Sequence, residues 1–364
     1  MHLESLLTAL RNRVPFSTMS AILKLSGFSI SQGAGKTVDK IIKEVDEGKE
    51  DYASEIEKLK QQYHDHLLVS EKAIRFFRAD KDRITKLTNL ITKNEVKNSD
   101  FLTLYPIPLS EEQLSKTEYK ISLVDLVESE QSLSLVYCSS RFIQERVKID
   151  TSELNPEAKK ELNSYDEVYG IKKYFYQFFD IVVLWKDKPF IEVRVDLTRD
   201  ISWQDRRKYA LEVVGEFNKL TEKVLGVKSL LKDPVNFFPL IKKLYDAKGE
   251  GKVGELAFTT DEGSIKNEKM RAGMGDLRDE TYHKAGRAAV DDICPYRIAV
   301  LWDSPISETL SIKNYLEVFL QGNCRSLSSQ NQVLEDVIIK KCSFLEEYKF
   351  VFDKINKYLW NNNV

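Results

Sequence analysis

The sequence predicts an α+β fold that is rich in helix, with an N-terminal all-helical region, a central mixed sheet and a long C-terminal helix. Three observations lead to this fold class. Apolar residues recur three, four or seven positions apart over 52–91 and 333–359, as on one face of an amphipathic helix. Apolar and charged residues alternate over 190–197, as in a strand with two different faces. Two further apolar runs, 253–258 and 296–302, enclose a polar segment rich in glycine.

Length and composition are those of a globular protein with two or three domains, since the chain has 364 residues, of which 42% are apolar and 31% charged. Lys and Arg number 55 and Asp and Glu 57, which gives a net charge of -2. This balance argues against a broad electrostatic footprint for DNA. Any nucleic-acid contact therefore needs a local patch. We expect a helical domain over 1–97, an α+β domain over 98–248 and a second α+β domain over 249–364.

Cysteine usage and the N-terminus indicate a cytoplasmic protein that does not contact membranes. Cys138, Cys294, Cys324 and Cys342 form no C-x-x-C pair, so they predict neither a zinc site nor a redox motif. Scattered cysteines in a chain of this size favour a reducing compartment. The N-terminus lacks the basic and apolar regions of a signal peptide. No apolar run approaches the ~18 residues of a spanning helix.

Residues 1–97 are expected to be helical throughout. The apolar stripe over 52–91 predicts a long helix that either packs within the chain or forms a coiled coil with a partner, and packing within the chain is the simpler interpretation. Gly33 to Thr37 imitates a phosphate loop, but Ile30 stands where that motif needs glycine. We therefore expect a helix N-terminus there. His64 and His66 are two positions apart, so they lie on different helix faces and are expected at the surface.

Strands and helices alternate from residue 99 onward. The clearest local pattern is a β-hairpin over 179–197, with a turn at 186–189 and side chains of alternating character in its second strand. The other expected strands are 119–127, 132–138, 141–149, 253–258 and 296–302. The expected helices are 155–162, 203–226, 233–245, 279–290, 311–320 and 328–360.

The hairpin offers one candidate catalytic site. Asp180, followed by Glu192 and Arg194 on the next strand, resembles the layout of metal-dependent nucleases of the PD-(D/E)xK type. In such a site the two acids hold Mg²⁺ and a lysine orients the attacking water. Arg194 stands in place of that lysine and cannot take a proton from water, although it could clamp a phosphate. The alternative is a strand face whose charged residues form surface ion pairs.

The glycine-rich stretch 249–303 offers a candidate binding site, because a long polar connection between two strands is uncommon unless it is functional. Its cationic side chains lie within a short segment and could converge on one anion, aided by backbone N–H groups after Gly273 and Gly275. His283 could act as a general base. The candidate binding residues are Arg271, Arg278, His283, Lys284 and Arg287.

Three functions remain open from the sequence. The favoured one is a non-catalytic subunit that binds a phosphate-bearing partner, foremost nucleic acid, within a larger assembly and without a cofactor. The second is the nuclease, which requires Mg²⁺ at Asp180 and Glu192. The third is a protein-binding scaffold that uses the amphipathic segments 50–95 and 328–360. Expected partners are one or more proteins and DNA or RNA, and the sequence does not determine the oligomeric state.

Overall fold

A computed structural model describes residues 3–48, 51–162, 164–199, 201–271, 273–310, 314–328 and 332–360. Its helices are α1 (Leu3–Arg13), α2 (Phe16–Leu25), α3 (Ala34–Asp46), α4 (Ala53–Val69), α5 (Lys81–Leu90), α6 (Glu111–Lys116), α7 (Pro156–Leu162), α8 (Trp203–Leu225), α9 (Phe238–Asp246), α10 (Thr281–Ala288), α11 (Ser307–Leu310) and α12 (Leu345–Trp360). Its strands are β1 (Lys72–Arg78), β2 (Ser122–Glu128), β3 (Ser132–Lys148), β4 (Tyr169–Trp185), β5 (Phe190–Asp196), β6 (Lys252–Thr260), β7 (Ile265–Lys269), β8 (Ile293–Asp303), β9 (Tyr315–Gln321) and β10 (Val337–Lys340). The predicted α+β class is confirmed.

One sheet joins all ten of these strands, in the order β2-β3-β4-β5-β1-β10-β9-β8-β6-β7. Every pairing between the described strands is antiparallel, so the sheet is not the mixed one expected. The sheet contains strands from 1–97, 98–248 and 249–364. The division of the chain into three domains at these boundaries stays a prediction.

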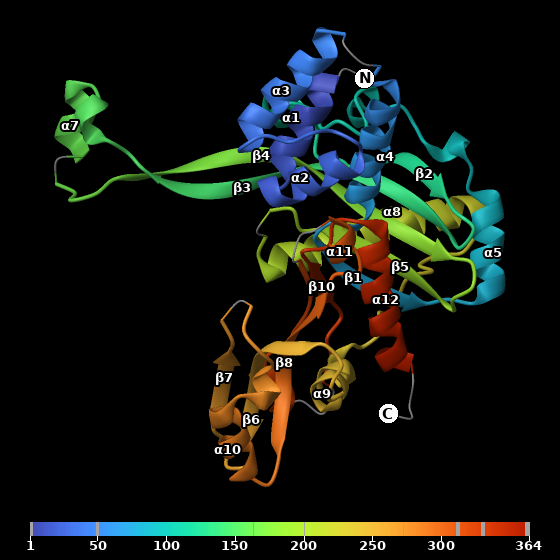
Figure 1. Cartoon of the computed structure of the whole chain (residues 1–364), viewed down its shortest axis with the longest axis vertical. Coiled ribbons are helices and arrows are strands. Elements are labelled where there is room, and N and C mark those ends of the chain that lie inside the picture. The colour runs from blue at the N-terminus through green and yellow to red at the C-terminus, as the bar shows by residue number, and fades with distance from the viewer. Residues whose placement is uncertain are drawn as a thin grey trace.

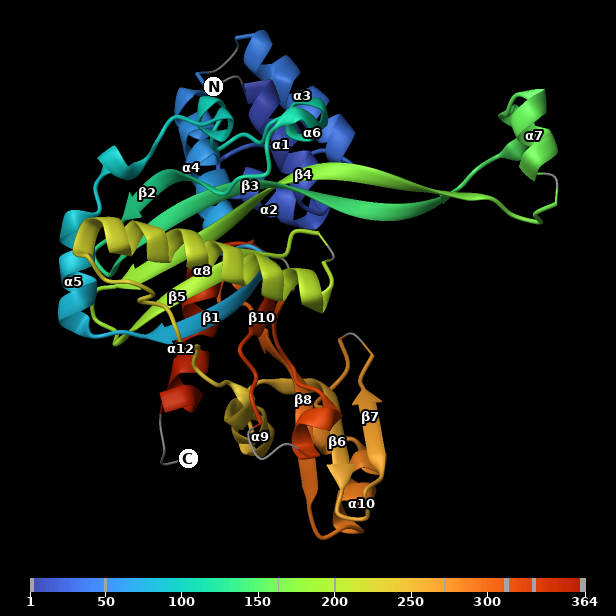
Figure 2. The same cartoon turned by 180° about the vertical axis from the view of Figure 1, so that it is seen from behind.

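Helices cover both faces of the half of the sheet that contains β1 to β5. Helix α12 lies in front of these strands in Figure 1, together with the bundle α1 to α4, and α8 crosses the opposite face in Figure 2. Phe179, Ile181 and Val183 face the bundle and α12, whereas Val182 and Leu184 face α5 and α8. Among the described helices, none is both long and apolar enough to cross a lipid bilayer.

The segment 52–91 is not the single helix that its apolar spacing predicted. Helix α4 ends at Val69, and the next residues form β1, which lies between β5 and β10. Six of the seven β1 side chains are buried, because helices cover both faces of the sheet there. The N-terminal region is therefore not all-helical. Leu59 and Leu87 are fully buried in the chain's own core, which rules out a continuous coiled coil over this range.

Two predicted C-terminal helices also contain strands. Residues 315–321 form β9, in which Leu316, Val318 and Leu320 are fully buried and alternate with partly exposed residues. The segment 328–360 contributes β10 and then α12, which begins only at Leu345. The run Val337-Ile338-Ile339 is β-branched throughout, a composition that favours a strand. The C-terminal helix is confirmed but is shorter than expected.

Several elements begin or end where residues typical of helix ends and hairpin turns occur in the sequence. Helix α8 is capped by the Ser202 hydroxyl at its start, and Gly226, with φ of 69°, ends it in the left-handed conformation. Helix α3 starts after Gly33, which confirms a helix N-terminus at the segment that imitated a phosphate loop. Strands β4 and β5 confirm the 179–197 hairpin.

His64 and His66 are not surface residues, and their environments shift their pKa values in opposite directions. His66 is buried and contacts the Ser343 carbonyl, and burial lowers its pKa to about 3. Burial alone would also lower the pKa of His64, but its hydrogen bond to Asp125 and the nearby Asp65 carboxylate outweigh this effect and raise it to about 9. Both histidines belong to α4, which therefore contributes a pH dependence to folding.

We expect the two histidines to change stability over different pH ranges. An unfolded histidine has a pKa of about 6.5. As the pH decreases, His66 therefore takes up a proton in the unfolded state before it does so in the folded state. The free energy of unfolding then falls by up to about 1.4 kcal/mol per pH unit between about pH 6.5 and 3. His64, in contrast, takes up its proton in the folded state at a higher pH than in the unfolded state. The stabilisation from protonated His64 is therefore complete below about pH 6.5 and disappears as the pH rises through about 9.

Urea unfolding between pH 5 and 9 measures both effects. The stability of wild type minus that of His66→Gln should increase with pH up to about 6.5 and then level off. The corresponding difference for His64→Gln should decrease between about 6.5 and 9. Two variants with pH profiles parallel to wild type would contradict these assignments.

Candidate functional site

The glycine-rich stretch 249–303 forms the end of the sheet that is farthest from β2. Strands β6, β7 and β8 lie there with α10, in the orange part of Figure 1. A 3-10 turn, Leu277–Asp279, precedes α10. The five candidate binding residues are distributed over this unit and do not converge on one point.

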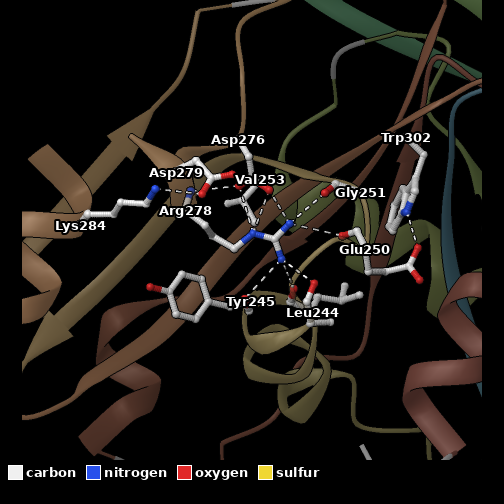
Figure 3. A network of polar contacts seen from close by, with 11 residues as sticks. Leu244, Tyr245, Glu250, Gly251, Val253, Asp276, Arg278, Asp279, Lys284 and Trp302 are labelled. Carbon is white, nitrogen blue, oxygen red and sulfur yellow. Dashed lines mark hydrogen bonds and ion pairs between the residues drawn. The ribbon is translucent and has the colours of Figure 1, made fainter. Parts of the chain in front are cut away.

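Arg278 points inward and holds several segments together (Figure 3). Its Nε donates to both carboxylate oxygens of Asp276 at 3.0 Å. Its Nη1 donates to the carbonyls of Leu244, Tyr245 and Ala247, the last of these at 2.7 Å, and Nη2 donates to the Gly251 carbonyl at 2.8 Å. These carbonyls end α9 or follow it, so Arg278 caps the C-terminus of that helix. Its side chain is 9% exposed, and it is not available to an external anion.

His283 is buried between α9, α10 and β7. Its Nδ1 lies 2.5 Å from Glu268 Oε2, and its Nε2 lies 2.9 Å from the Tyr245 hydroxyl. The Glu280 carboxylate caps the start of α10 by accepting from the His283 backbone N–H. With both ring nitrogens bonded inside the fold, His283 links three elements.

The remaining cations of this segment are exposed to different degrees. Arg287 donates to the Val290 and Asp291 carbonyls at the end of its own helix and contacts Asp292. Lys284 pairs with Asp279 at 3.1 Å. Arg271 is exposed and has no side-chain hydrogen bond or ion pair with the described residues.

Arg271 lines a pocket of about 250 Å³ on the face of β6, β8 and β9. Lys252, Lys269 and Lys341 also line this pocket, with Met270 and Met274. Two glutamates reduce its positive charge, since Lys269 pairs with Glu255 at 3.2 Å and Lys341 with Glu317 at 3.5 Å. Of the five candidate binding residues, Arg271 alone keeps an unpaired cationic group within the described part of the chain.

The structure does not bring Asp180 and Glu192 together. In the β4–β5 register Glu192 lies opposite Val183, so these two side chains share a face of the sheet. Side chains alternate along a strand, which places Asp180 on the other face. The contacts agree, because Asp180 pairs with Arg141 on the α8 side whereas Glu192 accepts from Tyr348 of α12. Two carboxylates on opposite faces cannot hold one Mg²⁺ ion.

Glu192 and Arg194 form a buried pair, not the exposed one that was the alternative to a nuclease site. Arg194 donates from Nε and Nη2 to the two Glu192 oxygens at 3.0 Å each, and from Nη1 to the Leu68 carbonyl at 3.1 Å. Glu192 also accepts from the Trp185 indole at 2.9 Å. Glu192 is fully buried and Arg194 is 4% exposed, so these groups are occupied within the fold.

Asp180 and Asp196 accept hydrogen bonds from backbone N–H groups where the pairing of β4 with β5 ends. The β4–β5 ladder ends at the pair Ile181 and Arg194. Beyond it, Asp180 Oδ1 accepts from the Asp196 N–H, and Asp196 Oδ2 accepts from the Phe179 N–H, both at 2.9 Å. The two carboxylates thus replace the carbonyls that a continuing ladder would supply. Among the described residues, no group of three or more His, Cys, Asp or Glu side chains could hold a metal ion. The nuclease hypothesis gains no support from this geometry.

Beyond this point β3 and β4 leave the sheet as a two-stranded arm, which we define as residues 142–175. Figures 1 and 2 show the arm projecting far from the body, with α7 at its tip. The arm strands pair only with each other, from Phe142 opposite Phe175 to Lys148 opposite Tyr169. Beyond the root of the arm, where Phe175 packs against the core, both faces are open, and Ile171 is 65% exposed and Phe142 45%. An isolated two-stranded ribbon is only marginally stable in water.

Charge is unevenly distributed along the arm. Its strands, 142–148 and 169–175, carry four cations and one acid, and the connection 149–168 carries six acids and two lysines. The register gives one ribbon face three cations and no acid. We call this the basic face; its residues are Phe142, Gln144, Arg146, Lys148, Tyr169, Ile171, Lys173 and Phe175.

Cations and aromatic rings are interleaved on the basic face. Arg146 lies over the Tyr169 ring, 3.9 Å from its centroid, and Lys173 over the Phe142 ring at 4.6 Å. Lys148 is neutralised by Glu167 of the connection, at 2.6 Å. Within the described residues, Arg146 and Lys173 have no carboxylate in ion-pairing distance, so two charges on this face remain available.

Sequence reasoning found the strand at 141–149 and the aromatic run 165–179, but not that they form an arm. The available signal was the combination of these two segments around the polar connection 149–168. Core packing is the commoner role of such an aromatic run, and only the register shows that half of it lies outside the core.

No protein-family model matches this chain, and no curated protein is significantly similar to it in sequence. The function is therefore inferred from the geometry.

Proposed function

We propose that this protein is a non-catalytic subunit that binds a nucleic acid through the basic face of the arm, within a larger cytoplasmic assembly. The observation that carries the proposal is a ribbon face with three cations, three aromatic rings and no acid, on an element that projects from the body.

The chemistry of this face suits a nucleic acid for two reasons. Cations attract the phosphate backbone and release its counterions, and aromatic rings stack on bases without strong sequence preference. A two-stranded ribbon also fits the major groove of a DNA duplex. A local patch reconciles this function with a net charge of -2, because the basic face itself carries no acid and most acids of the arm lie in its connection, 149–168.

The test is fluorescence anisotropy with labelled single-stranded and duplex DNA and RNA of unrelated sequence. Arg146→Ala combined with Lys173→Ala should weaken binding by about tenfold near 0.1 M salt. The salt dependence should also become shallower, with a log–log slope smaller by about 1.8 for a duplex or 1.4 for a single strand.

The matched control removes the same charge from the tip of the arm. Lys159 and Lys160 are both exposed on α7, among acidic neighbours. Their double replacement by alanine should leave the affinity close to that of wild type. Equal losses in both double variants would indicate only long-range attraction, and unchanged binding by the Arg146 and Lys173 variant would rule out the basic face as the site.

A further inference from the structure

A cleft of about 770 Å³ lies at the root of the arm. It is lined by α1, by the segment 104–114, by residues 175–178 of β4, and by Thr198 and Arg199. Sites that enclose small molecules have volumes of roughly 300–1,000 Å³, so this cleft is large enough for one.

The cleft combines an apolar wall with a polar one. Leu104, Ile107, Leu109, Leu114 and Phe175 supply apolar surface. The α1 wall is polar and exposed at Glu4, Thr8 and Asn12, which recur at one-turn spacing along one face of the helix. A molecule with an apolar body could lie along α1 against the opposite wall.

Arg13 marks one end of the cleft with a buried cation that is incompletely bonded. Its side chain is 7% exposed, and Nη2 donates to Asp196 at 2.6 Å. A guanidinium group has five N–H donors. Nε of Arg13 is buried and has no hydrogen-bond partner in the described structure.

Positive charge exceeds negative charge at this end. Asp196 also lies 3.8 Å from the buried Lys72 ammonium, so one carboxylate serves two cations. Its oxygens already accept from Thr198 and the Phe179 N–H. Burial lowers the pKa of Lys72 to about 8, partly opposed by Asp196. A buried charge without a counter-charge is costly, and an anionic group would supply one.

Neighbouring charges do not remove this excess. Asp180 is paired with Arg141, and Glu192 with Arg194, so each of these pairs is neutral. Arg199 adds a further cation beside Arg13, and donates to the Asn12 carbonyl at 2.9 Å. The buried cluster therefore keeps a net positive charge at the Arg13 end of the cleft.

The end of the cleft opposite Arg13 carries negative charge. Glu4 also lines the cleft and precedes Arg13 by nine residues, which is about 13 Å along α1. Its carboxylate would repel a second negative group, so the site distinguishes the two ends of an elongated ligand.

We propose that this cleft binds a small amphipathic anion, with a carboxylate or phosphate head at Arg13 and an apolar body that lies along α1 towards Glu4. The proposal does not rest on nucleic-acid binding by the arm, although the cleft and the basic face share Phe175.

Isothermal titration calorimetry of the full chain tests it with three probes that each contain a chain of ten carbons: decanoate, decyl phosphate and decyltrimethylammonium. At least one of the two anions should bind with one-to-one stoichiometry, and about tenfold or more tighter than the cation. The tighter of the two anions identifies the preferred head group. Binding of neither anion, or equal binding of the cation, would overturn the proposal.

Variants locate the bound probe. Thr8 is exposed and lines the cleft, and Thr8→Trp should weaken anion binding by about tenfold or more, whereas Thr85→Trp at an exposed position of α5 should not. Arg13→Met should weaken binding and still fold, because Lys72 remains to neutralise Asp196. If Thr8→Trp binds the anion as wild type does, the cleft is not the site, whatever the outcome for Arg13→Met.

Discussion

Glu192→Ala is expected to lower the free energy of unfolding by about 3–5 kcal/mol, the usual cost of removing one partner of a buried ion pair. The variant would leave the Arg194 guanidinium buried, with the Leu68 carbonyl as its one remaining acceptor among the described residues, and would remove an acceptor from Trp185 and Tyr348. Chemical denaturation followed by circular dichroism measures the change.

A matched control and a double variant test whether the buried ion pair causes this loss of stability. Glu128 pairs with Lys186 at 2.9 Å but is 68% exposed, so Glu128→Ala should cost less than about 1 kcal/mol. Glu192→Met combined with Arg194→Met removes both charges and should recover much of the loss. If Glu192→Ala folds with wild-type stability, the buried pair is not structural, and the role of Glu192 in a metal-dependent nuclease would have to be reconsidered.

Arg278→Ala is expected to lower the free energy of unfolding by about 3 kcal/mol, since a charged group that is bonded to several buried acceptors is removed. The carbonyls of Leu244, Ala247 and Gly251 would lose their donor, and α9 would lose its C-terminal cap. Thermal and urea unfolding of the purified variant measure the effect.

Arg287→Ala is the natural control, because that arginine is 38% exposed and lies in the same segment. Its replacement should change stability by less than about 0.5 kcal/mol. If both arginines were surface ligands of an anion, replacing them together would weaken partner binding with little loss of stability, but the buried contacts of Arg278 argue against that outcome. An Arg278→Ala variant that is stable but binds nucleic acid less tightly would restore the glycine-rich segment as an anion site.

The candidate site residues were predicted less well than the fold, because the side-chain types that bind anions or metals also stabilise buried backbone. Arg278 has the chemistry of a phosphate ligand, and the structure uses it on helix carbonyls. Asp180 and Glu192 have the spacing of a metal site, and the register places them on opposite faces. Spacing along the chain could not reveal either outcome, because both depend on contacts between distant segments.

The sequence by itself determined the elements whose signals lie within a few residues. The 179–197 hairpin follows from alternation around a turn, α8 from its apolar stripe with Ser202 and Gly226 at its ends, and α3 from its glycine lead-in. Helix caps and hairpin turns depend on contacts between residues close together in the chain, so they form in the same way whatever the tertiary structure is.

Only the tertiary structure decided the centre of the sheet and the arm. Strand β1 lies between β5 and β10. In the sequence its apolar residues fit the spacing of a helix, and only the burial of both faces of the sheet explains why they form a strand. Strands β3 and β4 are continuous through the core and the arm, and they become an exposed ribbon where β2 and β5 stop pairing with them. Strand pairing joins residues far apart in the chain, and a strand's own residues do not record which neighbours it will have or where they end.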